Sequence, residues 1–209
     1  YYKNIPAKSD IPKEEALKLI RGYRACVSYA DAQVGKIMAE LKKLGLDKNT
    51  VVVLLGDHGW SLGDHNQWCK HSNFNIVNNA PLIIKVPGNQ KKGAEPKVVE
   101  FVDVYPTLCE AVGLPVPHHT EGESMMKLMT GEDKSWKDCA IIKWHSGVTY
   151  FDRDYGYTQW NDKAGNFQGH MLFLYRNDHL ETKNVADAPE NKEIVAQLQN
   201  CLLYTSDAA

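Results

Sequence analysis

Two side chains that can bind a metal ion, Asp57 and His58, directly follow the apolar run at residues 51–55. A continuous run of β-branched and aliphatic residues is typical of a parallel strand buried on both faces, which we expect here. Open α/β sheets bind their ligands beyond the carboxyl ends of such strands. Gly56 and Gly59 allow the chain to turn sharply at this point. The sequence therefore predicts that a carboxylate and an imidazole emerge together where α/β folds carry out chemistry.

These donors suit a divalent cation. Carboxylate oxygens favour Ca²⁺ or Mg²⁺, whereas an imidazole beside a carboxylate would better suit Zn²⁺ or Mn²⁺. Two ligands do not complete a site, so others must come from elsewhere. Lys70 follows in the same loop and could hold an anion as a point charge. A metal ion and a lysine together are the usual clamp for a tetrahedral oxyanion such as sulfate or phosphate.

Each of these residues also has a simpler structural interpretation. The Asp57–His58 pair could form a capped turn, and a lone lysine such as Lys70 is more often solvated. His65 could be a ligand, an acid or a hydrogen-bonding loop residue. Trp60, like Trp68, could line a sugar-binding cleft or cover the core side of the loop.

The cysteines favour neither a zinc knuckle nor a particular redox compartment. Four of them precede residue 200 and form no C-x-x-C pair: Cys26, Cys69, Cys109 and Cys139. Cys69 could join His65 and His71 in a zinc site, but their arrangement matches no standard ligand spacing.

Hydrophobic periodicity predicts the elements that position these residues. Residues 13–44 predict a long helix, with Asp10 as a nearby cap, Pro12 in the first turn and Gly45 at the left-handed end. Strands at 50–55 and 81–86 flank a loop, residues 57–80, whose length is usual for functional loops. Further along the chain, the pattern predicts a strand at 98–101, a helix at 103–112 capped by Asp103, and a short helix at 123–129.

The second part of the chain has a different pattern. Four short strands with tight turns predict an antiparallel sheet, followed by a helix at 191–199; the strands are at 140–144, 148–151, 155–160 and 171–176. We therefore expect an α/β fold, with residues 1–135 forming part of a large mixed sheet flanked by helices and residues 136–200 a smaller antiparallel subdomain. Residues 201–209 read like the translation of a sequencing adapter, and we exclude them from the fold prediction.

The composition is that of a globular protein, with 43% hydrophobic and 24% charged residues. A net charge of −2 gives no reason to expect nucleic acid or an anionic membrane as a general partner. No apolar run approaches the roughly 20 residues that span a bilayer. The chain starts at Tyr1 rather than at a methionine, so we expect it to begin inside a longer protein or after processing.

The chain resembles the C-terminal portion of the type I sulfatases of the alkaline phosphatase superfamily, and within them the iduronate-2-sulfatase group with its bacterial relatives. The core motif is Gly-Asp-His-Gly-Trp-Ser-Leu-Gly-Asp-His, which begins at Gly56. The segments that carry the likeness span nearly all of residues 20 to 200; they are residues 22–35, 51–70, 79–83 with 102–108, and 174–178 with 181–185.

The resemblance implies roles for individual residues. Asp57 and His58 match the metal ligands of the family, for which Ca²⁺ is the usual ion and Mg²⁺ an alternative. Lys70 matches the lysine that contacts the sulfate group. Trp60 and His65 match positions that border the substrate. Residues 1–135 would then be the C-terminal part of the catalytic domain.

One family feature is missing from this sequence. Sulfatases use a formylglycine made from a Cys or Ser in a C-x-P-S-R motif, and no cysteine here begins such a motif. The family also has two further acidic metal ligands near its N-terminus, and these are missing too. We therefore expect the nucleophile and the remaining ligands in an N-terminal half of the parent protein, and we expect this fragment to be inactive alone.

The resemblance implies a sulfuric ester hydrolase that removes sulfate from a sulfated sugar or polysaccharide such as a glycosaminoglycan. It implies a periplasmic or extracellular location, or a lysosomal one in eukaryotic relatives. Two alternatives stay open: a phosphate or phosphonate ester hydrolase of the same superfamily, and a non-catalytic carbohydrate-binding relative that has lost its nucleophile.

Overall fold

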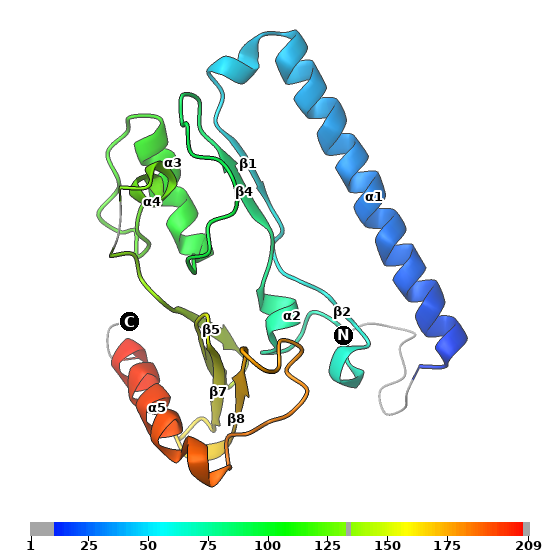
Figure 1. The fold of residues 1–209 in the computed structure, drawn as a ribbon, viewed down its shortest axis with the longest axis vertical. Helices are drawn as coiled ribbons and strands as arrows, with labels where there is room; N and C mark the ends of the chain where they lie inside the picture. The colour runs from blue at the N-terminus through cyan, green and yellow to red at the C-terminus, as the bar shows by residue number, and fades with distance from the viewer. Residues whose placement is uncertain (1–10, 133–134, 207–209) are drawn as a thin grey trace.

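The structure is a computed structural model that describes residues 11–132 and 135–206. Its first element is the predicted long helix, α1 (Lys13–Lys43), which begins at Pro12 without a side-chain cap. The predicted cap, Asp10, lies outside the described residues. Gly45 has the expected left-handed conformation, with φ 72°, and leads into η1 (Leu46–Lys48). In Figure 1 the helix α1 is a separate rod beside the strands that follow, and it has no fully buried residue.

The strand before the Asp57–His58 turn is β1 (Val52–Leu55), and it pairs with β4 (Leu82–Lys85). The pairing is antiparallel, so the expected parallel, fully covered strand is wrong. Leu54 and Leu55 are 40% and 44% exposed. An apolar run shows only that a strand tends to bury its side chains. Whether two strands pair parallel or antiparallel depends on the segment that connects them. Here residues 57–80 connect β1 to β4 so that β4 runs in the opposite direction.

Residues 57–80 are more structured than the predicted loop. They contain two short strands that pair antiparallel, a 3-10 turn and a single helical turn: β2 (Ser61–Leu62), η2 (Asp64–Asn66), β3 (Trp68–Cys69) and α2 (Asn75–Asn78). Gly63 has φ 110°, which is suited to glycine, and the Asp64 carboxylate accepts the N–H of Leu62 at 3.1 Å. The helical turn α2 lies between the β1–β4 pair and the C-terminal sheet (Figure 1).

The predicted strand at 98–101 is wrong. The chain there enters η3 (Phe101–Asp103), followed by the predicted helix as α3 (Val104–Ala111) and the later short helix as α4 (Met126–Thr130). Asp103 is fully buried, and its carboxylate accepts the N–H groups of Glu100 at 2.8 Å and Glu123 at 3.0 Å. Its Oδ2 also lies 2.7 Å from Lys137 Nζ. These side-chain hydrogen bonds outweigh the β propensity of the preceding valines.

The antiparallel sheet predicted for the second part is confirmed. Its strand order is β5-β6-β7-β8, and all three pairs are antiparallel. The strands are β5 (Ala140–Trp144), β6 (Gly147–Phe151), β7 (Tyr155–Asn161) and β8 (Phe167–Leu174). Together with the helices, they confirm a fold of mixed helices and sheets.

One face of this sheet is covered by α5 (Lys192–Ser206), which follows η4 (Pro189–Asn191). Tyr157 and Leu172 of the sheet are fully buried against Val195 and Leu198 of the helix. The helix is longer than the predicted one and runs into the segment that we excluded, where Leu202 joins the same core. Residues 207–209 of that segment lie outside the described residues.

The buried carboxylate of Asp103 generates a stability prediction. Asp103→Ala leaves two backbone N–H groups without their acceptor and removes one of the two carboxylates that pair with Lys137, so we expect the free energy of unfolding to fall by about 3 kcal/mol or more. Denaturant titration measures this. The matched control is Asp138→Ala, which removes the exposed partner of Lys97 and should change stability by less than about 0.5 kcal/mol. Equal effects of the two substitutions would contradict the structural role of Asp103.

Candidate functional site

The turn after β1 is held by backbone contacts on both sides. The Gly56 N–H donates to the carbonyl of Pro81 at 2.9 Å, and the Gly59 N–H donates to the carbonyl of Val77 at 2.6 Å. A Cβ atom on Gly59 would lie 2.1 Å from the carbonyl oxygen of Ile76, so a side chain at this position does not fit. The turn that carries Asp57 and His58 is thus pressed directly against the backbone of α2.

Asp57 and His58 lie side by side at this turn. The Asp57 side chain is 82% exposed and its Oδ2 lies 3.3 Å from His58 Nε2. His58 Nδ1 lies 2.7 Å from the carbonyl oxygen of Gly59. Because a carbonyl only accepts, this contact assigns a proton to Nδ1, and in the neutral imidazole Nε2 presents its lone pair.

That lone pair faces a carboxylate, which is repulsive unless a proton or a cation lies between the two groups. Metal-binding histidines usually donate their other ring N–H to a carbonyl or carboxylate, which fixes the tautomer. The contact from His58 to the Gly59 carbonyl has this form. The two side chains therefore fit a shared divalent cation as two of its ligands.

Trp60 lies beside the imidazole. Its ring stacks with His58 at a centroid distance of 5.9 Å and with Tyr23 of α1 at 6.1 Å. The indole therefore connects the long helix to the His58 ring. An aromatic surface of this kind restricts the orientations that the imidazole can adopt and can also offer a face to a sugar.

Lys70 follows β3 and is partly buried. Within the described part of the chain, its ammonium makes no ion pair or side-chain hydrogen bond. A partly buried lysine without an anionic partner is available to an anionic ligand.

The zinc alternative does not fit the geometry. His65 stacks on Phe74 at a centroid distance of 3.8 Å, and His71 stacks on Trp144 at 4.9 Å, so the two imidazoles contact different neighbours. Burial raises the pKa of the Cys69 thiol, which disfavours the thiolate that zinc requires. Among residues 11–132 and 135–206, no three His, Cys, Asp or Glu side chains are grouped as metal ligands.

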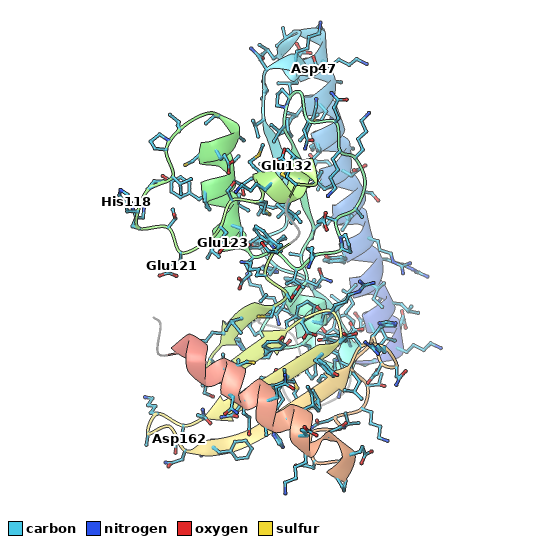
Figure 2. The ribbon with its side chains drawn as sticks, turned by 60° about the vertical axis from the view of Figure 1, so that its left-hand side comes forward. Asp47, His118, Glu121, Glu123, Glu132 and Asp162 are labelled. Atoms are coloured by element: carbon cyan, nitrogen blue, oxygen red, sulfur yellow. The ribbon has the colours of Figure 1, made fainter. Side chains whose placement is uncertain are left out.

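Several acidic and histidine side chains lie at the periphery of the molecule. Figure 2 shows Asp47 and Asp162 at opposite ends of the molecule, and His118 with Glu121 on the outer loop after α3. Any further ligand for a cation at Asp57 and His58 must therefore come from beyond these side chains.

A cavity of about 770 Å³ is lined by Asp57 and His58 together with residues from the C-terminal part of the chain, including Arg153, Tyr175 and His179. Lys70, Trp60 and His65 are not among its lining residues. The structure thus brings the two predicted metal ligands to one cleft and places the other three predicted site residues outside its wall. Arg153 and His179 were not predicted from the sequence, because a polar residue in a turn or loop is normally solvated.

Asn75, the first residue of α2, was also missed. It lines the same cavity, and its Oδ1 is buried without a hydrogen-bond partner within the described structure. Buried amide oxygens are normally satisfied, so this atom is available to a ligand. No feature of its surrounding sequence distinguishes it from an ordinary loop asparagine.

Sequence and structure comparisons place this chain among known proteins. The sulfatase family model matches residues 1–114, and the model of the C-terminal region of N-sulphoglucosamine sulphohydrolase matches residues 63–207. The chain is 35% identical over 132 residues to iduronate 2-sulfatase of Mus musculus, which covers 51% of this chain and 24% of that protein. None of the helices in the described residues is long and apolar enough to cross a membrane.

Two solved structures have a similar fold. A 2-O GAG sulfatase superposes with a TM-score of 0.82 at 27% identity, covering 92% of this chain and 44% of that one. The phosphonate monoester hydrolase of Agrobacterium radiobacter superposes with a TM-score of 0.84, covering 99% and 45%. At 23% identity the second likeness shows the fold alone. The chain spans less than half the length of each of these three relatives. Since the sulfatase model alone matches more than half of the residues, this chain belongs to the sulfatase family.

Proposed function

We propose that the protein to which this chain belongs hydrolyses sulfate esters on a sulfated sugar, and that Asp57 and His58 bind the divalent cation required for that reaction. The single observation that carries the proposal is the facing pair of Asp57 Oδ2 and His58 Nε2, 3.3 Å apart at the edge of a cleft. The sulfatase family uses a metal ion and a formylglycine in general, so a cation at such a pair is consistent with the family.

The donor set favours Ca²⁺, with Mg²⁺ as the alternative, because the exposed Asp57 carboxylate offers hard oxygen ligands. The remaining ligands of the cation and the formylglycine nucleophile would come from other parts of the whole protein. When bound, the cation neutralises negative charge on the oxygens of the sulfate group.

The side chains around this pair have separate roles in the proposal. Lys70 donates hydrogen bonds to the sulfate oxygens, for which its unpaired ammonium is suited. Trp60 keeps the His58 ring in place and borders the sugar. His65 also borders the sugar.

The substrate class follows from the relatives. The mouse relative is an iduronate 2-sulfatase and one similar structure is a 2-O GAG sulfatase. We extend this to a sulfated sugar of a glycosaminoglycan, which would be encountered in the periplasm, outside the cell or in a lysosome.

The metal role is tested by Asp57→Asn in the whole protein. The substitution removes a charged ligand, so we expect cation affinity to fall by at least about 100-fold and metal-dependent turnover to be lost. Isothermal titration with Ca²⁺ and with Mg²⁺ measures the affinity. Asp64→Asn is the matched control, because Asp64 bonds only the local turn, and it should bind the cation as the unaltered protein does. Unchanged affinity in Asp57→Asn would exclude the ligand role.

Lys70→Ala tests the anion contact. Loss of a donor to a charged transition state should lower kcat by about 10²–10³-fold. The control is Lys42→Ala on the exposed side of α1, for which we expect the original rate. Steady-state kinetics on a sulfated disaccharide give both values. A rate for Lys70→Ala within twofold of the original would remove this residue from the site.

The competing activity is tested on matched substrates. The fold is shared with a phosphonate monoester hydrolase, so a sulfate ester and a phosphonate monoester of the same leaving group should be compared in the whole protein. We expect a higher kcat/KM for the sulfate ester, by about tenfold or more. A preference for the phosphonate would replace the proposed function, and turnover of neither ester would favour a carbohydrate-binding role.

A further inference from the structure

We propose that the C-terminal subdomain positions the metal-binding turn through a buried relay, in which Glu181 holds the start of α2 and α2 holds Gly59. This inference rests on the proposed role of Asp57 and His58 and adds Glu181 and Tyr175 as positioning residues. Neither of them forms a hydrogen bond or an ion pair with Asp57 or His58.

The first step of the relay is the carboxylate of Glu181, which is only 5% exposed. Its Oε2 accepts the backbone N–H of Asn75 at 2.8 Å, and its Oε1 accepts the hydroxyl of Tyr175 at 2.7 Å. Glu181 and Asn75 are 106 residues apart in the chain. One side chain thus joins the segment after β8 to the first residue of α2.

Glu181 has an unusual backbone conformation. Its φ is 56°, in the left-handed region that residues other than glycine seldom adopt. Such a conformation is strained and persists only where the surroundings hold it. The two hydrogen bonds of the carboxylate hold it here, together with the bond from the Glu181 N–H to the carbonyl of Asp178 at 3.2 Å.

The donor to Glu181 is also fixed in place. A Cβ atom on Gly156 would lie 2.1 Å from the hydroxyl oxygen of Tyr175, so only glycine at position 156 leaves room for this hydroxyl. Burial raises the pKa of Tyr175, and the charge of Glu181 raises it further, so the phenol keeps its proton and donates. Burial raises the pKa of Glu181, and the hydrogen bond from Tyr175 opposes this rise.

The second step runs from α2 to the metal-binding turn. Val77 is 4% exposed, and its carbonyl accepts the N–H of Gly59 at 2.6 Å. Around α2, the Asn78 N–H donates to the carbonyl of Phe74 and the Asn79 N–H donates to the carbonyl of Asn75, so this helical turn is one hydrogen-bonded unit. A shift of the Asn75 backbone is therefore transmitted to the residue that follows His58.

A second set of contacts ties the same segment to the sheet. The Asn73 side-chain amide donates to the carbonyl of Gly147 at 3.3 Å and to Thr149 Oγ1 at 3.1 Å, and Asn73 is 6% exposed. The Phe74 ring lies 6.0 Å from that of Phe173 in β8. Hydrogen bonds and ring packing therefore attach the segment between Lys70 and α2 to the C-terminal sheet, although this segment comes well before the sheet in the sequence.

The test compares two substitutions at one position in the whole protein. Glu181→Ala removes both hydrogen bonds, and we expect Ca²⁺ affinity to fall by about 10–100-fold, the usual effect of losing an outer contact that orients a ligand. Glu181→Gln keeps an oxygen that accepts the Asn75 N–H, and its amide N–H can donate to the Tyr175 oxygen, with the hydroxyl changed from donor to acceptor, so it should stay within about threefold of the original affinity. Because the relay acts on cation binding, a saturating Ca²⁺ concentration should restore the kcat of Glu181→Ala.

A matched control separates positioning from general destabilisation. Leu198→Ala opens the core beneath α5 without touching α2, and it should lower the thermal midpoint while leaving Ca²⁺ affinity unchanged. If Glu181→Ala does not fold, Tyr175→Phe takes its place, with an expected loss of about threefold to tenfold. The relay would be overturned if Leu198→Ala had the same Ca²⁺ affinity as Glu181→Ala, or as Tyr175→Phe where that variant is used instead.

The outcomes also separate this inference from the proposed function. Cation binding by the original protein with no loss in Glu181→Ala would overturn the relay alone. Absence of cation binding in the original protein would overturn the metal role of Asp57 and His58, and the relay with it. Affinity lost in Glu181→Ala, retained in Glu181→Gln and unaffected by Leu198→Ala would support both.

Discussion

The contact between the Gly59 N–H and the Val77 carbonyl, at 2.6 Å, is the interaction on which the candidate site depends. It joins the end of β1 to α2 with no side chain between the two backbones. Glycine is required because a Cβ atom would collide with the neighbouring carbonyl of Ile76. The contact determines where Asp57 and His58 emerge, and it makes their position depend on whatever holds α2.

The electrostatics of the turn add a second constraint. The carboxylate of Asp57 is exposed to solvent, whereas His58 is largely covered by Trp60 and by its own hydrogen bond to Gly59. A nitrogen lone pair that faces a carboxylate is a poor hydrogen-bonding arrangement for the protein alone, and a good one for a cation. The pair of His170 and Asp187 differs at the second ring nitrogen. Nδ1 of His170 lies 3.3 Å from the hydroxyl of Tyr157, which can donate a hydrogen bond, so Nε2 can carry the ring proton and donate it to Asp187.

Much of the fold was predictable, and the errors have physical causes. The helix at α1, the four antiparallel strands and α5 each depend on a repeating local pattern, so the sequence indicates them directly. The direction of β1 and the absence of a strand at 98–101 were not predictable in this way. The first depends on how residues 57–80 return the chain, and the second on the hydrogen bonds that Asp103 makes with residues distant in sequence.

The sequence by itself determined the chemistry that this chain can offer: a carboxylate and an imidazole after a strand, a lysine in the following loop, and the motif typical of sulfatases. Residue types and short spacings are sufficient for this, because donor atoms and turns are local properties. Only the tertiary structure decided that Asp57 and His58 share a cleft with Arg153 and His179, and that Glu181 reaches the start of α2. These relations join residues far apart in the chain, and they exist only because the C-terminal sheet packs against the segment that carries the turn.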